Sequence, residues 1–446
     1  MQISFFGACG EVTGSNFLLE TADKKILFDC GLFQGVNSAE ERNYALFPYE
    51  AKTIDFVVIC HAHLDHVGRL PKLAREGFSG KIFSTAPTKE LAGLVLEDNE
   101  KLMREEAERN NHAPLYNKDD IARVMQFFET IGYRETIEIS PGIKLTLKNA
   151  GHILGSAVAL IEAEGKKLAY SSDLGNNPSL LLDPPETFDS ADYIVSESTY
   201  GGRIHEDISK RQEKLAKIIS ETVAKRGVLL IPSFAIERTQ ELLHDVDHFC
   251  TVYGCDKPAF YLDSPLAQKV TSVFGKYPEY LSSKLETDHN ADLFGLARLK
   301  ITNNVDESKS INDAPAPKVI IAGSGMMNGG RILYHALRYL TDSNNALLFV
   351  GYQAKGTLGR RLYDGEKQVK IFGEKIKVHA QIKSIGSYSA HADMPQLLDW
   401  ISSIGGCRQV FVCHGEVEQA TILAAEIKEQ LKINAEIPNI GQIYNL

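Results

Sequence analysis

A short apolar run that leads directly into a cluster of ionisable side chains is the feature that most constrains this chain. Residues 57–60 (VVIC) are continuously apolar, as in a strand buried on both of its faces. His61, His63, Asp65 and His66 follow within six residues. Because all four leave the same strand end, they can converge on one point, and imidazole and carboxylate suit zinc, and also manganese or iron. The sequence therefore predicts a metal site here, in preference to a polar loop that holds histidines by chance.

Three more candidate ligands stand at the ends of other expected strands. His152 lies in a glycine-rich motif at 151–156, Asp173 follows the strand at 167–170, and His414 follows the strand at 409–413. Taken singly, each could be a turn-forming aspartate or a hydrogen-bonded histidine. Together with the first cluster they supply seven ligands, enough for two metals with Asp173 as a bridge. Two metals about 3.5–4 Å apart are the arrangement used for hydrolysis at phosphorus or carbonyl carbon.

The order of the expected elements changes near residue 200. Before this point short strands predominate, with helical periodicity at 88–110. After it, helices at 206–226, 237–249 and 329–340 alternate with apolar strands at 227–232, 318–322 and 346–350. This alternation is typical of a parallel sheet with helices packed on it. From about 378 further strands and helices close the chain, and we expect an α/β protein with more than one domain.

The composition of the 446 residues excludes some classes of protein. No apolar run reaches roughly 18 residues, which excludes a membrane-spanning helix. The start of the chain has no basic segment, so we expect no cleaved signal peptide. The seven cysteines form no CxxC pair, which indicates neither a disulfide framework nor a cysteine zinc finger and fits a reducing, cytoplasmic location.

Charge is distributed unevenly along the chain. The net charge is −10, yet residues 323–383 hold ten Lys or Arg against four acids, a local charge of +6. Such a run is either a solvated face or a surface for an anionic substrate, and the sequence leaves both open.

Seven ordered motifs resemble those of a known family. The segments at 28–31 (FDCG), 61–66 (HAHLDH), 151–156 (GHILGS) and 171–175 (SSDLG) resemble the metallo-β-lactamase motifs. Those at 196–201 (SESTYG), 388–393 (YSAHAD) and 413–416 (CHGE) are similar to the β-CASP branch of nucleases. The resemblance covers essentially the whole chain, including 231–235 and 323–327. It is strongest to prokaryotic homologues of the nuclease subunit that cleaves eukaryotic pre-mRNA 3′ ends.

The resemblance implies a fold and a set of ligands. The fold is an αββα metallo-β-lactamase sandwich, formed by residues 1–200 and 378–446, with an inserted α/β β-CASP domain at 201–377. By position in the motifs, one metal would be held by His61, His63 and His152, the other by Asp65, His66 and His414, and Asp173 would bridge them. Asp29 would lie behind the ligands and orient the first loop.

The resemblance also implies a metal-dependent ribonuclease that acts on single-stranded RNA during RNA processing or decay, as an endonuclease and also as an exonuclease. Two zinc ions per chain, or manganese, would lower the pKa of a bridging water and deliver hydroxide to phosphorus. His391 would protonate the leaving sugar oxygen and Glu197 would hold its imidazole; these two and Asp65 are the expected catalytic residues. A purely structural Glu197–His391 pair is the alternative.

The expected partners are single-stranded RNA and a second copy of the chain in a homodimer. RNA is preferred over DNA because the last motif carries His414, where the DNA-processing branch resembles valine. Candidate RNA contacts lie in the inserted segment. They are Ser233, Arg331, Lys355, Arg360 and Arg361.

Three rival functions can be compared with the sequence. A small-molecule hydrolase of the same fold would share the early motifs but lack the insertion and the His391 motif. A non-catalytic scaffold should have a broken cluster at 61–66, and here it is intact. A DNA nuclease of the same family stays open.

Overall fold

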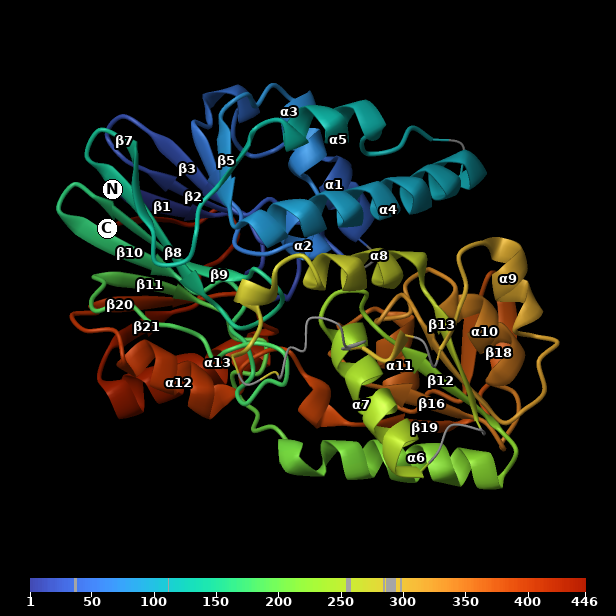
Figure 1. Ribbon diagram of the computed structural model, residues 1–446. Helices are drawn as coiled ribbons and strands as arrows, with labels where there is room; N and C mark the ends of the chain where they lie inside the picture. The colour runs from blue at the N-terminus through green and yellow to red at the C-terminus, as the bar shows by residue number, and fades with distance from the viewer. Residues whose placement is uncertain (36–37, 111, 254–257, 284, 286–293, 297–298) are drawn as a thin grey trace. The chain divides into compact units, whose positions relative to one another are not determined.

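The computed structural model describes residues 1–35, 38–110, 112–253, 258–283, 285, 294–296 and 299–446. The chain forms two compact units (Figure 1). The first unit comprises Met1–Gln34, Ser38–Ile204 and His391–Leu446, so both termini belong to it. The second comprises His205–Ala390 together with Gly35.

The first unit contains two seven-stranded sheets. In spatial order, the first sheet consists of β22 (Ile443–Asn445), β1 (Gln2–Phe5), β2 (Phe17–Glu20), β3 (Lys25–Phe28), β4 (Phe56–Val58), β5 (Lys81–Ser84) and β6 (Phe128–Thr130). The second consists of β21 (Asn434–Glu436), β20 (Gln409–Val412), β11 (Tyr193–Ser196), β10 (Lys166–Tyr170), β9 (Ala157–Ala163), β8 (Ile143–Asn149) and β7 (Thr136–Ser140).

The two sheets pack face to face around one apolar core. Alternate strand residues point inward, such as Ile3 and Phe5 in β1 and Leu145 and Leu147 in β8. A second core lies between the second sheet and its helices. Figure 1 shows α3 to α5 beside the first sheet and α12 and α13 beside the second, which gives the expected αββα order.

The helices of the first unit are mostly short. They are α1 (Ala39–Tyr44), α2 (Leu64–Val67), α3 (Leu70–Arg75), α4 (Ala86–Asn110), α5 (Lys118–Met125), α12 (Met394–Ser402) and α13 (Val417–Glu426). The expected helix at 88–110 corresponds to α4, which begins two residues earlier.

The second unit is built on a six-stranded sheet in which every pairing is parallel. Its order is β14 (Lys300–Ile301), β13 (Ala259–Asp263), β15 (Lys318–Ala322), β12 (Val228–Pro232), β16 (Ala346–Phe349) and β19 (Gln381–Ser384). An antiparallel hairpin, β17 (Gln368–Ile371) and β18 (Glu374–Lys377), forms a separate two-stranded sheet.

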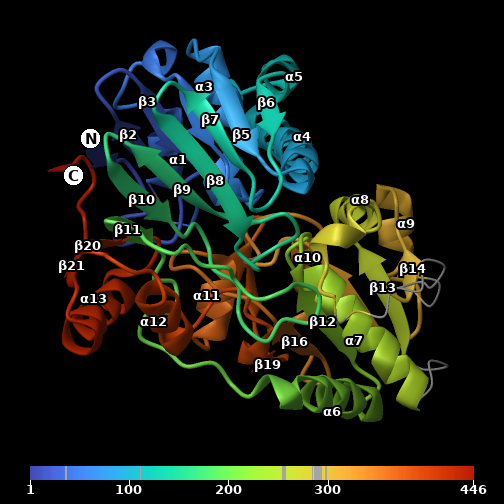
Figure 2. The same ribbon diagram turned by 60° about the vertical axis from the view of Figure 1, so that its left-hand side comes forward.

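Helices flank this parallel sheet, and Figure 2 shows α7 running alongside β12 and β13. The helices of the unit are α6 (Arg211–Ala224), α7 (Arg238–Tyr253), α8 (Pro265–Phe274), α9 (Val305–Ser310), α10 (Ile332–Tyr339) and α11 (Leu358–Tyr363). Apolar residues of β12, β15 and β16 pack with α10 and with the inward side of the hairpin in one core. The α/β character expected from the sequence is confirmed in both units.

The compact units divide the chain at different points from the expected boundaries at 200/201 and 377/378. The breaks fall at 204/205 and 390/391. The reason for the second difference is β19, which pairs in parallel with β16 and so places residues 378–390 with the second unit. His391 is then the first residue after the return to the first unit.

Two expectations from composition can be set against the structure. In the described part of the chain, no helix is long and apolar enough to cross a membrane. Cys9, Cys30, Cys60, Cys407 and Cys413 are free thiols. Cys250 is disulfide-bonded, which the sequence analysis did not expect, and Cys255 lies outside the described residues.

Candidate metal centre

The first ligand cluster is fixed by backbone contacts with the loop before β2 and the loop after β3. The amide N–H of Cys30 donates to the carbonyl of His66 at 2.7 Å, and that of Ser15 donates to the carbonyl of Asp65 at 2.9 Å. A Cβ on Gly31 would lie 1.6 Å from the carbonyl oxygen of Asp65. Only glycine allows this close approach, so the FDCG motif holds the one-turn helix α2 that carries Asp65 and His66.

Three further functional side chains follow three neighbouring strands. β10, β11 and β20 are adjacent and parallel. Asp173, Glu197 and His414 come directly after them in that order. Because the carboxyl ends of parallel strands meet at one edge of a sheet, residues far apart in the sequence are brought together there.

His152 stands on a tight loop between β8 and β9. Its backbone N–H donates to Ser156 Oγ at 3.0 Å. Gly151 has a φ of +66°, and a Cβ on Gly175 would lie 1.9 Å from the Gly151 carbonyl oxygen. The glycines of these two motifs therefore permit the loop approach that brings His152 to Asp173.

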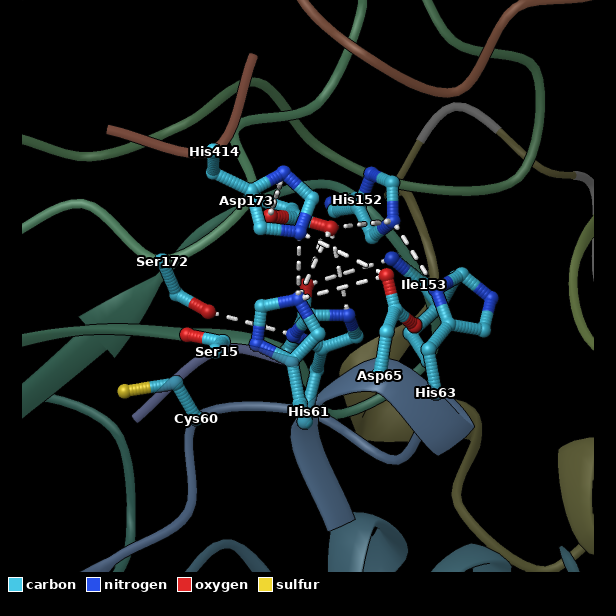
Figure 3. A network of polar contacts seen from close by, with 12 residues as sticks. Ser15, Cys60, His61, His63, Asp65, His152, Ile153, Ser172, Asp173 and His414 are labelled. Carbon is cyan, nitrogen blue, oxygen red and sulfur yellow. Dashed lines mark hydrogen bonds and ion pairs between the residues drawn. The ribbon is translucent and has the colours of Figure 1, made fainter. Parts of the chain in front are cut away.

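Four side chains form the first ligand group: His61, His63, His152 and Asp173. Their ligand atoms all lie within 4.8 Å of one another. Asp173 Oδ2 is 3.4 Å from His61 Nε2 and 3.6 Å from His152 Nε2. His152 Nε2 is 3.2 Å from His63 Nδ1. Figure 3 shows these side chains pointing toward one another.

Asp65, His66 and His414 form the second group, also within 4.8 Å. His66 Nε2 and His414 Nε2 are 3.1 Å apart, and His414 Nε2 is 3.4 Å from Asp65 Oδ2. Asp173 approaches this group as well, at 3.4 Å from His66 Nε2 and 3.5 Å from His414 Nδ1. The carboxylate of Asp173 therefore faces both groups.

The donor set fits metal ions. Within the described residues, His61 Nε2 and Asp173 Oδ1 are buried without a hydrogen-bond partner. Buried polar atoms are normally satisfied, so atoms left open in one crowded cluster suit the binding of a cation. Imidazole nitrogens and carboxylate oxygens with no thiolate are the ligands of hydrolytic zinc and manganese sites.

The electrostatics favour the metal-binding protonation states in the first ligand group, whereas burial opposes charge on His66 but Asp173 and Asp29 outweigh it and raise the pKa of that imidazole well above its usual range. Burial, assisted by neighbouring histidines, lowers the pKa of His61, takes that of His63 to about 3, and holds that of His152 well below its usual range. Burial opposes ionisation of Asp173, but His414 and His66 outweigh it, and the pKa of this carboxyl lies well below its usual range. Neutral imidazole and ionised carboxylate are the forms that bind metals.

Asp29, the residue expected to orient the first loop, contacts the candidate ligand His66. Its Oδ2 accepts hydrogen bonds from Tyr170 OH at 2.5 Å and from Ser15 Oγ at 3.3 Å, and lies 2.7 Å from His66 Nδ1. With the Nδ1 proton of His66 directed at this carboxylate, Nε2 is left to face the metal cluster.

Sequence reasoning did not single out three residues that orient ligands. Ser172 Oγ is 3.1 Å from His61 Nδ1, and Thr199 Oγ1 is 3.3 Å from His414 Nδ1. Tyr170 supports Asp29, as described above. Ser172 and Thr199 lie inside two of the recognised motifs, and this was the available signal.

Glu197 and His391 form a pair next to the cluster. His391 Nδ1 is 3.2 Å from Glu197 Oε2 and 4.0 Å from Asp173 Oδ2. Burial disfavours the charged imidazole, but Glu197 outweighs it and raises the pKa of His391. Glu197 itself accepts the backbone N–H of Leu174 at 2.6 Å, so it is held in place.

The five candidate RNA contacts all lie in the second unit, and Ser233 and the three arginines are held by partners within it. Ser233 is buried, and its Oγ accepts from Thr239 Oγ1 at 3.0 Å. Arg331 donates to Asp263 at 2.7 Å. Arg360 is paired with Asp364 at 2.9 Å, and Arg361 with Glu366 at 2.7 Å. The remaining candidate, Lys355, is exposed.

Comparison with known proteins places the chain in a family. A metallo-beta-lactamase superfamily domain matches residues 18–198, a Beta-Casp domain matches 239–362, and a Zn-dependent metallo-hydrolase RNA specificity domain matches 375–438. The chain belongs to the metallo-β-lactamase superfamily, in its β-CASP branch, and the resemblance seen in the motifs is confirmed.

Several relatives match nearly the whole chain. Ribonuclease TTHA0252 from Thermus thermophilus is 38% identical over 425 residues, 95% of each chain. The RNase J-like protein from Methanocaldococcus jannaschii is 32% identical and covers 99% of each chain. Transcription termination factor FttA from the same organism is 32% identical over 98% of this chain and 70% of its own length.

A solved structure agrees in fold alone. The crystal structure of a protein of unknown function from Enterococcus faecalis V583 covers 100% of this chain with a TM-score of 0.56 and 12% identity.

Proposed function

We propose that this protein is a metal-dependent ribonuclease that hydrolyses phosphodiester bonds of single-stranded RNA. The observation that carries the proposal is the convergence of two ligand groups on Asp173, with the Glu197–His391 pair beside them. The names of two relatives, a ribonuclease and an RNase J-like protein, support the choice of RNA. RNA processing or decay is the corresponding role.

In this proposal the two groups hold one ion each, zinc or manganese. His61, His63 and His152 would hold the first, Asp65, His66 and His414 would hold the second, and Asp173 would be shared between them. Bound metal ions supply Lewis acidity and lower the pKa of a water toward neutrality. The chain itself orients the ligands through Asp29, Ser172 and Thr199.

His391 is the proposed proton donor to the leaving sugar oxygen. Its Nδ1 is directed at Glu197, which leaves the proton on Nε2 available for transfer. Glu197 raises the pKa of His391, which favours the charged imidazole that a general acid requires. A purely structural Glu197–His391 pair would make the same contact. Only the cleavage kinetics of His391 variants therefore separate the catalytic role from the structural one.

The remaining parts of the proposal concern organisation. The second unit serves as the β-CASP domain, and the protein cuts RNA internally and also from an end. Arg331, Lys355, Arg360 and Arg361 contact the phosphates, and two chains associate as a homodimer.

The test is cleavage of labelled RNA by metal-loaded protein. Single-stranded RNA labelled at the 5′ end, or at the 3′ end, should yield internal fragments for an endonuclease and nucleotide-sized products for an exonuclease. The matched control is Asp173→Asn, which removes the charge that both ligand groups share. Absence of cleavage by protein with measured bound metal would overturn the proposal, and preferential cleavage of matched DNA would favour the DNA nuclease.

A further inference from the structure

An exposed aromatic pair joins the hairpin β17–β18 to helix α10 in the second unit. Tyr334, on α10, is 61% exposed, and Phe372, at the tip of the hairpin, is 47% exposed. Their ring centroids are 4.7 Å apart at an interplanar angle of 36°. Scattered single apolar residues are normal on a protein surface, but two aromatic rings in tilted contact with each other in solvent form a small platform.

A phenylalanine at position 372 is unusual because of the backbone conformation there. Phe372 and Gly373 connect the two strands with φ values of +49° and +86°. A two-residue turn with both φ values positive favours Asn, Asp or Gly, and a bulky side chain is disfavoured in the left-handed region. The chain therefore accepts both an unfavourable conformation and an exposed ring at this position. Strain of this kind concentrates at functional sites.

The outward face of the same hairpin is basic. Lys370 lies directly opposite Lys375, and Gln368 lies opposite Lys377. All four are exposed, while Val369, Ile371 and Ile376 alternate with them and pack into the core of the unit. Like charges directly across a strand pair repel, so this face gains from binding an anion.

These lysines differ from the arginines chosen from the sequence. In the described part of the chain, Lys370, Lys375 and Lys377 are within ion-pair distance of no acidic residue, whereas Arg331, Arg360 and Arg361 are paired with acids. In a chain of net charge −10, the hairpin is therefore a basic surface that the protein itself does not neutralise.

We propose that Tyr334, Phe372 and the lysine face form a binding platform for single-stranded RNA, made of residues other than those of the metal centre. Bases stack on the two rings, and Lys370, Lys375 and Lys377 contact phosphates. Aromatic rings beside a basic surface are the usual means of binding single strands without reading sequence. The proposal rests on the proposed function for the nature of the nucleic acid.

Protection of a sheet edge is the other use of such lysines. Edge lysines prevent strands of different molecules from pairing. That use does not account for the two rings, because an exposed apolar tip promotes the association that the lysines would prevent.

The test measures RNA affinity by fluorescence anisotropy on the full chain, with chelator present so that the labelled RNA stays intact. Phe372→Asn is the sharpest variant, because Asn suits the positive φ and the hairpin keeps its fold. Phe372→Asn combined with Tyr334→Ala should weaken binding about tenfold or more. Lys370→Gln with Lys375→Gln should flatten the slope of log affinity against log salt by about 1.4, since each phosphate contact on a single strand contributes about 0.7.

The matched control is Lys225→Gln with Lys428→Gln, two exposed lysines elsewhere, which makes the same change in net charge. It should leave both affinity and slope unchanged. Wild-type affinity in the aromatic variant would overturn the platform. The platform would also be overturned if the aromatic variant changed the sedimentation of the protein but left RNA affinity unchanged. The surface would then be a contact between copies of the chain. If wild-type protein binds RNA through the hairpin but never cleaves it, the proposed function fails while the platform stands.

Discussion

His391 and His414 are alike in the sequence but lie in different surroundings. His414 directs Nε2 at His66 and Asp65 and Nδ1 at Asp173, whereas His391 is held by Glu197. His414→Ala should lose metal and activity together. His391→Ala should retain both metals and bind RNA, yet cleave more slowly by about 10²–10⁴-fold, the usual contribution of general acid catalysis. Elemental analysis and single-turnover cleavage measure the two effects.

A modified substrate separates the acid role of His391 from a structural one. An RNA whose leaving oxygen is replaced by sulfur needs little protonation, so it should rescue much of the His391→Ala defect and none of the His414→Ala defect. Metal loss in His391→Ala, or failure of sulfur to rescue it, would assign His391 as a ligand or as a structural partner of Glu197.

At the scale of elements, Asp263 ties together the carboxyl end of β13, α9 and α10. It accepts hydrogen bonds from Ser308, Arg331 and His335, each at 2.7 Å. Burial opposes its ionisation, but the hydrogen bonds, that of His335 first, outweigh it and lower the pKa from 3.8 to about 2. Because the folded-state pKa lies below the unfolded value, this stabilisation is present above about pH 4 and is lost as the pH falls toward about 2.

Asp263→Asn should therefore lower the free energy of unfolding near neutral pH by about 2 kcal/mol or more, since the shift corresponds to about 1.4 kcal/mol per pH unit. The difference in the free energy of unfolding between Asp263→Asn and wild type should become smaller as the pH falls. Urea unfolding followed over a pH series measures it, with the exposed Asp23→Asn as the control. A difference independent of pH would mean that Asp263 contributes by packing and not by its charge.

The packing of strands and helices also explains which parts of the fold and of the candidate site could be predicted from the sequence. A ligand that follows a buried strand, such as His61 or Asp173, is visible because strand and motif are contiguous. The partner of Arg331 is not visible, because Asp263 lies 68 residues away and only the parallel sheet brings them together. The expected boundary at 377/378 differs from the structural one for a similar reason, since nothing local shows that β19 pairs with β16.

At the scale of the whole molecule, removal of the metal ions should destabilise only the first unit. All seven candidate ligands belong to the first unit, although they come from segments as distant as His61 and His414. A ligand that binds only the folded state stabilises it, by about 4 kcal/mol at a thousand times its dissociation constant. We therefore expect freshly purified protein to hold about two metal ions per chain.

Chelation should lower the melting temperature of the first unit and abolish cleavage, while the transition of the second unit stays in place. Calorimetry with elemental analysis before and after chelation measures this, and Asp173→Asn should respond less than wild type. Freshly purified, unchelated protein that holds no transition metal and melts identically after chelation would count against the metal centre itself.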